Sequence, residues 1–350
     1  MFEKLCMKNG ECAVSYLTIK NDILKGKIAP VYFMFGQQSF LMEDIIQTVI
    51  QQKIGSVEDP NIITYNCQDT LIEVAIEEAE TVPFFGGTKV VIVKDCSFVL
   101  AKPETKLDHN INILERYVEN PVKETVLFLC APYEKLDARK KLTKLLKKQT
   151  VVDCSPFDLR STERWLDEQV NEKGVRFVGV AKERLIERVG FQLLQLSSEV
   201  EKLALYVGED GEITEDDVDL LVARSLEQDI FALIEYAVIK KVDRALIIYH
   251  DLLKLKEEPL KILALIARQI RIYYQVKEMV KRSYSQGEIA SQLKLHPYVV
   301  KLASEQIRRF SEPFLLKMLE AAADTDYAIK SGRMDKIFAV ELLLMKLADE

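Results

Sequence analysis

Short apolar runs alternate with amphipathic segments along residues 1–157 of the chain. The runs have the length and the β-branched or aromatic composition of buried strands, and glycine, proline or polar residues bound them. The runs are Val31–Phe35, Ile62–Tyr65, Lys89–Lys94, Thr125–Cys130 and Thr150–Asp153. Because strands that alternate with helices form mainly parallel sheets, this pattern predicts an α/β domain with helices on both faces of the sheet.

The segments between these runs have the apolar spacing of helices. The expected helices are Tyr16–Leu24, Phe40–Ile50, Leu71–Glu80, Leu107–Val118 and Leu136–Lys148. The last of them is strongly basic, and its charge is equally compatible with a solvated outer face and with a surface that faces DNA. Residues 1–15 show no clear periodicity, so we expect a loose extension there.

After Pro156 the pattern is helical, and we expect no further strand. A first group of predicted helices comprises Thr162–Lys173, Ala181–Val189, Leu193–Tyr206 and a short helix from Thr214 to Val222. A second group comprises Ile230–Lys240, Val242–Leu255, Pro259–Arg282, Ser285–Leu293, Pro297–Arg309, Glu312–Ile329 and Lys336–Ala348. The sequence therefore predicts three domains: an α/β domain over residues 1–157, a small helical domain over 158–224 and a helical bundle over 225–350.

The composition is typical of a soluble globular protein, since hydrophobic residues make up 48% and charged residues 29% of the 350 positions. No apolar run approaches the roughly 18 residues that a membrane span needs. The first ten residues lack the apolar core of a signal peptide. These features predict a cytoplasmic protein that has no membrane partner.

Cysteine and histidine spacing argues against metal and disulfide chemistry. The six cysteines are Cys6, Cys12, Cys67, Cys96, Cys130 and Cys154. None forms a CxxC pair, and several lie in or beside apolar runs, so we expect buried, reduced thiols. The three histidines, His109, His250 and His296, are far apart, and we expect His296 to be solvated in a turn. Because no nucleophile and base stand at a known catalytic spacing, the sequence predicts no catalytic residue, no metal site and no cofactor.

Charge is unevenly distributed along the chain. The formal net charge of −7 disfavours a protein that coats nucleic acid by itself. From Arg268 to Arg309, however, nine lysines and arginines stand against three acidic residues. Within this region Gly287–Lys301 resembles a helix-turn-helix, so a DNA-binding regulator is one alternative function. The start of the second helix carries none of the arginine or asparagine side chains that read bases, and a solvated helical face remains the default interpretation.

The first predicted strand and the helix after it stand where a phosphate-binding loop would lie. Such a loop reads G-x-x-x-x-G-K-[ST]: its backbone N–H groups and lysine hold phosphates, and its hydroxyl binds Mg²⁺. Here Gly36 supplies the first glycine. Leu41 replaces the second glycine, Met42 the lysine and Glu43 the hydroxyl residue. Because a carboxylate repels phosphate, we expect the topology of a nucleotide-binding domain without nucleotide binding. Asp95 follows the third predicted strand, where a metal-binding acid could stand, but without the loop it has no metal to hold. An ATPase with an unusual nucleotide site is the second alternative function.

Two adjacent aromatic residues, Phe84 and Phe85, lie between a predicted helix and a predicted strand. Pro83 cannot continue the helix, and Gly86 and Gly87 permit backbone angles closed to other residues, so the aromatic pair lies in a bend. At most one of the two rings can easily turn into the core. The other is a candidate contact for a partner protein, whereas the alternative is that both rings pack the helix against the sheet.

Several phrases of the sequence together resemble the delta subunits of bacterial DNA polymerase III, from about Leu17 to Leu347. The phrases are Ala29–Gly36 with Phe40-Leu41, Thr81–Gly87 with Lys89–Val93, Leu196–Leu203, Asp229–Leu233, and Ile329–Leu347 with Lys330-Ser331-Gly332 and Glu341-Leu342-Leu343. Their order and spacing carry the resemblance. It implies an AAA+-like α/β domain, with the topology of P-loop NTPases and a degenerate P-loop. A helical lid over residues 158–224 and an all-α collar over 225–350 follow it.

The resemblance also implies a function in DNA replication. In this family two hydrophobic residues in a loose Q-x-x-x-L-F pattern insert into a pocket of the sliding clamp, and they correspond here to Phe84 and Phe85. Glu80, Val82 and Pro83 are expected to support the contact, although Glu80 stands where glutamine is usual and Phe84 replaces a smaller leucine. The implied protein is a part of the DNA-directed DNA polymerase holoenzyme and helps to open the clamp. The subunit itself is implied to have no ATPase activity. Its implied partners are the sliding clamp, the ATP-binding and stator subunits, which it meets through the collar, and primed DNA within the assembly only.

Overall fold

The computed structural model describes residues 11–56, 58–83, 86–103 and 105–349, with the backbone alone for 11–15 and 348–349. The contacts within the chain divide it into two compact units, Met1–Trp165 and Leu166–Glu350. The predicted α/β domain lies in the first unit, and almost all of the predicted lid and the whole of the predicted collar lie in the second. The domain boundaries at residues 157 and 224 stay predictions.

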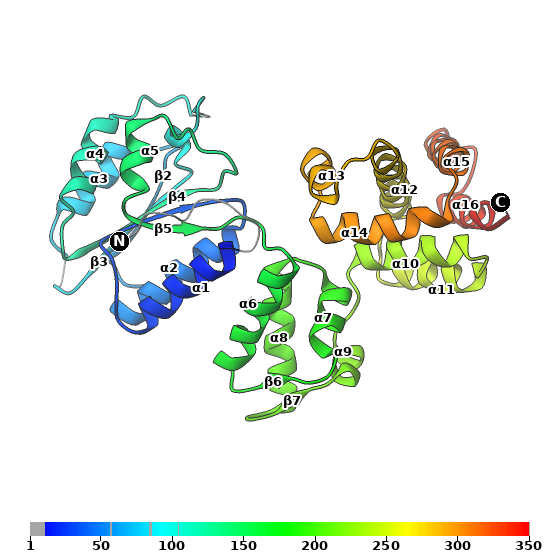
Figure 1. The fold of residues 1–350 in the computed structure, drawn as a ribbon, viewed down its shortest axis with the longest axis horizontal. Coiled ribbons are helices and arrows are strands. Elements are labelled where there is room, and N and C mark those ends of the chain that lie inside the picture. The colour runs from blue at the N-terminus through cyan, green and yellow to red at the C-terminus, as the bar shows by residue number, and fades with distance from the viewer. Residues whose placement is uncertain (1–10, 57, 84–85, 104, 350) are drawn as a thin grey trace. The chain divides into compact units, whose positions relative to one another are not determined.

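All five predicted strands are present and form one sheet (Figure 1). They are β1 (Val31–Phe35), β2 (Ile62–Asn66), β3 (Lys89–Lys94), β4 (Thr125–Ala131) and β5 (Thr150–Asp153). Their order is β2-β3-β4-β1-β5, and every neighbouring pair is parallel. A parallel sheet with β1 between β4 and β5 is the arrangement of an AAA+-like domain, so the predicted fold class is confirmed.

Helices cover both faces of this sheet (Figure 1). On one face lie α1 (Glu11–Leu24) and α2 (Ser39–Lys53); on the other lie α3 (Ile72–Glu80), α4 (Ile111–Glu119) and α5 (Lys141–Leu146), with the 3₁₀ turn η1 (Ser97–Val99) after β3. Side chains alternate between the faces along each strand. Phe33 of β1 therefore joins the core under α3 and α4, whereas its neighbour Tyr32 stacks on Phe128 of β4, with 5.0 Å between ring centroids.

The rest of the chain is almost entirely helical. Its elements are α6 (Leu159–Glu172), β6 (Arg176–Phe177), α7 (Ala181–Val189), α8 (Leu193–Val207), β7 (Glu212–Ile213), α9 (Glu215–Leu221), α10 (Leu226–Val238), α11 (Val242–Lys254), α12 (Pro259–Lys281), α13 (Gln286–Leu293), α14 (Pro297–Gln306), η2 (Ile307–Arg309), α15 (Glu312–Lys330) and α16 (Lys336–Asp349). One hydrophobic core runs from α10 to α16 and buries Tyr249 and Tyr273. Within the described ranges, no helix is long and apolar enough to cross a membrane.

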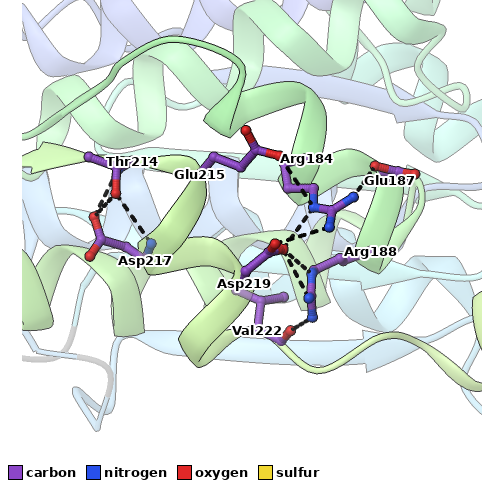
Figure 2. Close-up of polar contacts among 8 residues, drawn as sticks. All are labelled: Arg184, Glu187, Arg188, Thr214, Glu215, Asp217, Asp219 and Val222. Carbon is purple, nitrogen blue, oxygen red and sulfur yellow. Dashed lines mark hydrogen bonds and ion pairs between the residues drawn. The ribbon is translucent and has the colours of Figure 1, made fainter.

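An ion-pair cluster joins α7 to α9 (Figure 2). Arg184 and Arg188 of α7 both point toward the Asp219 carboxylate of α9, and Arg184 contacts it through two nitrogens, Nε at 2.7 Å and Nη2 at 3.0 Å. Arg188 also donates through Nη1 to the carbonyl of Val222 at 2.6 Å. These contacts lower the pKa of Asp219 to about 2, and the hydrogen bond from Arg184 is the largest cause. We call Arg184, Arg188 and Asp219 the arginine cluster.

A basic helix was predicted over Leu136–Lys148, and the prediction is wrong in its first half. The helix in this region is α5, Lys141–Leu146. The Asp137 carboxylate accepts a hydrogen bond from the backbone N–H of Arg139 at 3.0 Å and also binds the Arg139 guanidinium. Such a local side-chain contact competes with helical hydrogen bonding and favours a turn. Lys144, Lys147 and Lys148 remain exposed at or just after α5.

Other predicted boundaries in the α/β domain also differ from the structure. The predicted helix from Leu107 begins only at Ile111, because the segment before it bonds to α3: His109 Nδ1 accepts from the backbone N–H of Ile72, and the backbone N–H of Asn110 donates to Glu73. Residues 11–15 belong to α1, so the expected loose extension is wrong there. Residues 1–10 lie outside the described part.

The expectation that no strand follows Pro156 is also wrong. β6 and β7 form a two-residue parallel pair, in which Arg176 lies opposite Glu212 and Phe177 opposite Ile213. The Arg176 Nε donates to the Glu212 carboxylate at 3.1 Å across the pair. Two residues are too few for a period-2 pattern to be recognised, so contacts from far along the chain decide this pairing.

Candidate functional site

The loop between α3 and β3, residues 81–88, contains the predicted partner contact. Phe84 and Phe85 lie outside the described residues. Of the supporting residues, Glu80 at the end of α3 is exposed, Val82 is 82% exposed and Pro83 is partly buried. Covering an exposed apolar side chain such as Val82 removes apolar surface from water and so contributes favourably to the free energy of binding a partner. We call residues 81–88 the docking loop.

The backbone of the docking loop turns where the glycines were predicted to allow it. Gly86 and Gly87 have φ angles of +75° and +83°, in the left-handed region that other residues avoid. The backbone N–H of Gly86 donates to the carbonyl of Pro83 at 3.3 Å. A Cβ at either glycine would meet no atom within 4 Å, so the backbone angles, rather than crowding, favour glycine here.

Lys89, the first residue of β3, connects the two ends of the docking loop. Its residue exposure is 3%, and its ammonium group contacts the Glu78 carboxylate at 2.5 Å, the Glu78 carbonyl at 3.1 Å and the Thr81 hydroxyl. Burial of an ammonium group is costly unless it is paired, and here all three of its protons have acceptors. The hydrogen bond from Lys89 lowers the pKa of Glu78.

The last turn of α3 is held from the sheet as well. The hydroxyl of Thr125, the first residue of β4, donates to the carbonyl of Ala79 at 2.9 Å, and the Tyr117 hydroxyl approaches the same carbonyl at 3.5 Å. Burial raises the pKa of Tyr117 to about 12. Carbonyls at a helix C-terminus have no partner within the helix, so these side chains satisfy groups that α3 leaves open. Lys89 and Thr125 lie side by side in the β3–β4 register.

Sequence reasoning missed Glu78, Thr81 and Thr125. One signal was available: Lys89 opens a run of four apolar residues, and a charged residue at the start of a buried strand needs a partner. That partner comes from 11 residues earlier in the chain, and only the packing of α3 against β3 identifies it.

The degenerate P-loop lies close to the backbone that follows β5. Gly36 has a φ of +118°, and a Cβ at this position would lie 2.3 Å from the carbonyl carbon of Cys154. Leu41 and Met42, both buried residues of α2, stand in the places of a P-loop glycine and lysine. Glu43 is exposed, and its carboxylate lies 3.9 Å from the Lys94 ammonium group. The residues at the phosphate-binding positions are therefore two buried apolar side chains and one exposed carboxylate.

Asp95, which directly follows β3, is hydrogen-bonded to a side chain of the neighbouring strand β2. Its carboxylate accepts from the Asn66 side-chain amide at 2.7 Å, and its φ of +56° is unusual for a residue other than glycine. In the part of the chain that the structure describes, no group of three or more histidine, cysteine or acidic residues has a metal-binding arrangement.

Four of the cysteines, Cys67, Cys96, Cys130 and Cys154, are buried thiols, as predicted, at the carboxyl ends of β2 to β5. Burial raises the pKa of the Cys130 thiol to about 12 and that of Cys96 well above its ordinary value. Thiols with such pKa values are not reactive. Cys6 and Cys12 lie outside the residues whose side chains are described.

The helix-turn-helix-like segment is built into the bundle. Val300 and Ala303 of α14 lie in the hydrophobic core, so this helix turns one face inward. The expectation that His296 is solvated is wrong: its ring stacks on Phe191, with 3.8 Å between centroids, and its Nδ1 accepts from the backbone N–H of Tyr298 at the start of α14. Its role is therefore to cap a helix and pack against a ring.

Comparisons with known proteins agree on one family. The family model described as DNA polymerase III, delta subunit, matches residues 32–155, and the model of the C-terminal domain of that subunit matches residues 227–347. The DNA polymerase III subunit delta of Bacillus subtilis is 40% identical over 332 residues, which cover 93% of this chain and 95% of that protein. A probable DNA polymerase III subunit delta of Aquifex aeolicus is 23% identical over 268 residues, 72% of each chain.

A solved structure of a delta protein agrees with this family. The DNA clamp loader delta protein of Bacillus subtilis superposes with a TM-score of 0.81 and 38% identity, over 96% of this chain and 100% of that one. A match of this extent includes residues of both compact units, so it is not limited to the α/β domain.

Proposed function

This chain belongs to the family of DNA polymerase III delta subunits, and we propose that it binds the sliding clamp through the docking loop and helps to open it. Membership of the family makes it a clamp-loader subunit in DNA replication. The observation that best supports the finer proposal is the form of the docking loop, in which an exposed apolar side chain, Val82, stands on a rigidly held base.

In the proposed mechanism, Phe84 and Phe85 enter an apolar pocket of the clamp. Buried aromatic side chains can carry much of the binding energy of a protein interface, and the exposed Val82, two residues earlier in the sequence, adds apolar contact. Docking opens a clamp interface only to the extent that the loop binds the opened form more tightly than the closed form. Glu80 is exposed at the base of the loop and supplies a charged rim to the contact.

We further propose that the chain takes its energy from ATP held by other subunits. Leu41 and Met42 are buried and Glu43 is anionic at the positions that hold phosphate in a working P-loop, which disfavours the alternative of an ATPase with an unusual site. The collar, residues 225–350, meets the ATP-binding and stator subunits in this proposal. Assembly with them gives the cytoplasmic complex that acts on primed DNA.

Primed DNA is proposed as a partner within the assembly only. The exposed Lys144, Lys147 and Lys148 offer charge to phosphates, but three lysines on a chain of net charge −7 support only weak binding by the chain alone. The alternative of a DNA-reading regulator is less well supported, because α14 turns Val300 and Ala303 into the bundle and carries no base-reading side chain at its start.

The test is binding of the full chain to the sliding clamp of the same organism. We expect the Phe84→Ala/Phe85→Ala variant to lose at least ~2 kcal/mol of binding free energy, or about 30-fold in Kd. A matched control is Leu205→Ala/Tyr206→Ala, an adjacent apolar pair on α8 that is 80% and 55% exposed. If the control loses as much as the first variant, or if neither changes Kd, the docking loop is not the contact.

A further inference from the structure

We propose that Lys89 is a positioning residue for clamp binding, because it ties the last turn of α3 to the first residue of β3 and so fixes both ends of the docking loop. This inference rests on the proposed function, which it deepens. It concerns the group Glu78, Thr81 and Lys89, which we call the Lys89 cluster.

The contacts of Lys89 leave its ammonium group little freedom. Its side chain is 4% exposed, and each of its three protons has one acceptor: the Glu78 carboxylate, the Glu78 carbonyl and the Thr81 hydroxyl. Two of these acceptors belong to the last turn of α3, and the third is the first residue of the docking loop. A single side chain therefore sets the direction in which the chain leaves the helix.

The same side chain also sets the distance between the loop ends. Thr81 and Lys89 are eight residues apart in the sequence, and their side chains are in hydrogen-bond contact. Thr125, beside Lys89 in the sheet, holds the carbonyl of Ala79 and so fixes the helix end a second time. A loop whose ends are held in place has less conformational entropy to lose when it docks.

Within residues 78–89, the side chains that make the contacts of the Lys89 cluster differ from those that are exposed to a partner. Lys89 is buried and Glu78 partly buried, whereas Glu80 and Val82 between them in sequence are exposed. If Lys89 served only the stability of the sheet, an apolar residue at this position would serve equally well, because the other residues of β3 from Val90 to Val93 are apolar and buried.

Lys89→Met is the first test, with Lys94→Met as the matched control on the same strand. The Lys94 side chain is 48% exposed and 3.9 Å from Glu43, so its ion pair contributes little. We expect Lys89→Met to weaken clamp binding by about tenfold, mainly through a slower association rate, because fewer free molecules hold the loop in the docking geometry. Lys94→Met should bind as the parent does.

A second readout needs no clamp. In the free chain, amide hydrogen exchange in residues 81–88 should become about tenfold faster in Lys89→Met, with exchange in β4 and β5 unchanged. A purely structural role predicts faster exchange throughout the sheet. Trp165 is fully buried and packs against Phe40 of α2, so its fluorescence shows whether the variant is folded.

The outcomes separate this inference from the proposed function. If the parent does not bind the clamp, the proposed function fails, and the inference fails with it. If the parent binds and folded Lys89→Met binds equally well, only the inference fails. If Lys89→Met does not fold, Thr81→Val decides, because it removes one acceptor at an exposed position: we expect about threefold weaker binding and faster exchange in the docking loop, and parent-like values overturn the inference.

Discussion

Lys89 in the α/β domain and the arginine cluster in the second unit each hold a carboxylate, yet they differ in their exposure to water. The Lys89 side chain is 4% exposed and its partner Glu78 is 32% exposed. In the arginine cluster, Arg184 is 24% and Asp219 is 38% exposed. The first is a single buried cation with one ionised partner. In the second, two cations share the Asp219 carboxylate, and Arg184 also pairs with Glu187 at 2.9 Å (Figure 2).

The difference in exposure decides how much stability is lost when one charge of an ion pair is removed. Water replaces a lost partner at the surface, so exposed ion pairs contribute little to stability. A buried ammonium group has no such replacement, and removal of its partner leaves an uncompensated charge. The comparison therefore predicts a large effect at Glu78, a moderate one at Asp219 and a pH dependence confined to acid.

The largest expected effect is that of Glu78→Ala. We expect the free energy of unfolding of the α/β domain to fall by about 2–3 kcal/mol, below the range for fully buried pairs because Glu78 is partly exposed. Urea unfolding followed by the fluorescence of Trp165 measures it, since this is the single tryptophan of the chain. The control is Glu43→Ala, which removes the exposed partner of Lys94 and should stay within about 0.5 kcal/mol. Equal losses in the two variants would contradict the distinction between buried and exposed pairs.

Asp219→Ala is expected to have the next largest effect. Both Arg184 and Arg188 lose their shared partner, but each is partly in contact with water, so we expect a loss of about 1 kcal/mol. Hydrogen exchange in α7 and α9 measures it locally, because those helices are joined by the cluster. Asp216→Ala, at an exposed position of the same helix, is the control and should leave exchange in α7 unchanged. A loss above that of Glu78→Ala would reverse the comparison.

The smallest effect is a pH dependence. The folded pKa of Asp219 is lowered to about 2, so the stability that it contributes is complete above its unfolded pKa of about 3.9 and is lost as the pH falls through the folded value. The difference in unfolding free energy between the parent and Asp219→Asn should be constant from pH 7 to about 4 and shrink toward pH 2. Glu78, whose pKa is also lowered, should behave in the same way in acid. A difference that changes near neutral pH would mean that another group titrates in the cluster.

Much of the fold was predictable because its signals are local. Five apolar runs gave five strands within one residue of their bounds. The signal is clearest for β1, β3 and β4, which are buried along most of their length and need consecutive apolar residues. Thr214 and Ser285 were predicted to open helices, and each caps its helix through a capping box. The short β6–β7 pair and the shortened α5 were missed, because a distant partner strand decides the first and the Asp137 turn decides the second.

The candidate site was predictable in part. Gly86 and Gly87 take the angles that their sequence position suggested. Val82 is exposed, and its part in a contact with the clamp stays a prediction. The degenerate P-loop was readable because a missing lysine and glycine are features of the sequence itself. The Lys89 cluster and the stacking of His296 on Phe191 were not readable, since in both the partners come from other elements.

The sequence by itself determined three things: the order of the five long strands and the helices along the chain, the family, and the loss of the phosphate-binding residues at positions 41–43. Periodicity and residue type act over a few neighbouring positions. Only the tertiary structure decided which charges are buried and what they hold. Lys89 and Thr125 meet the end of α3 because β3 and β4 pair in register beneath it, and Thr125 lies 46 residues from the carbonyl that it satisfies. Burial and partnership depend on the packing of distant segments, and no local pattern encodes that packing.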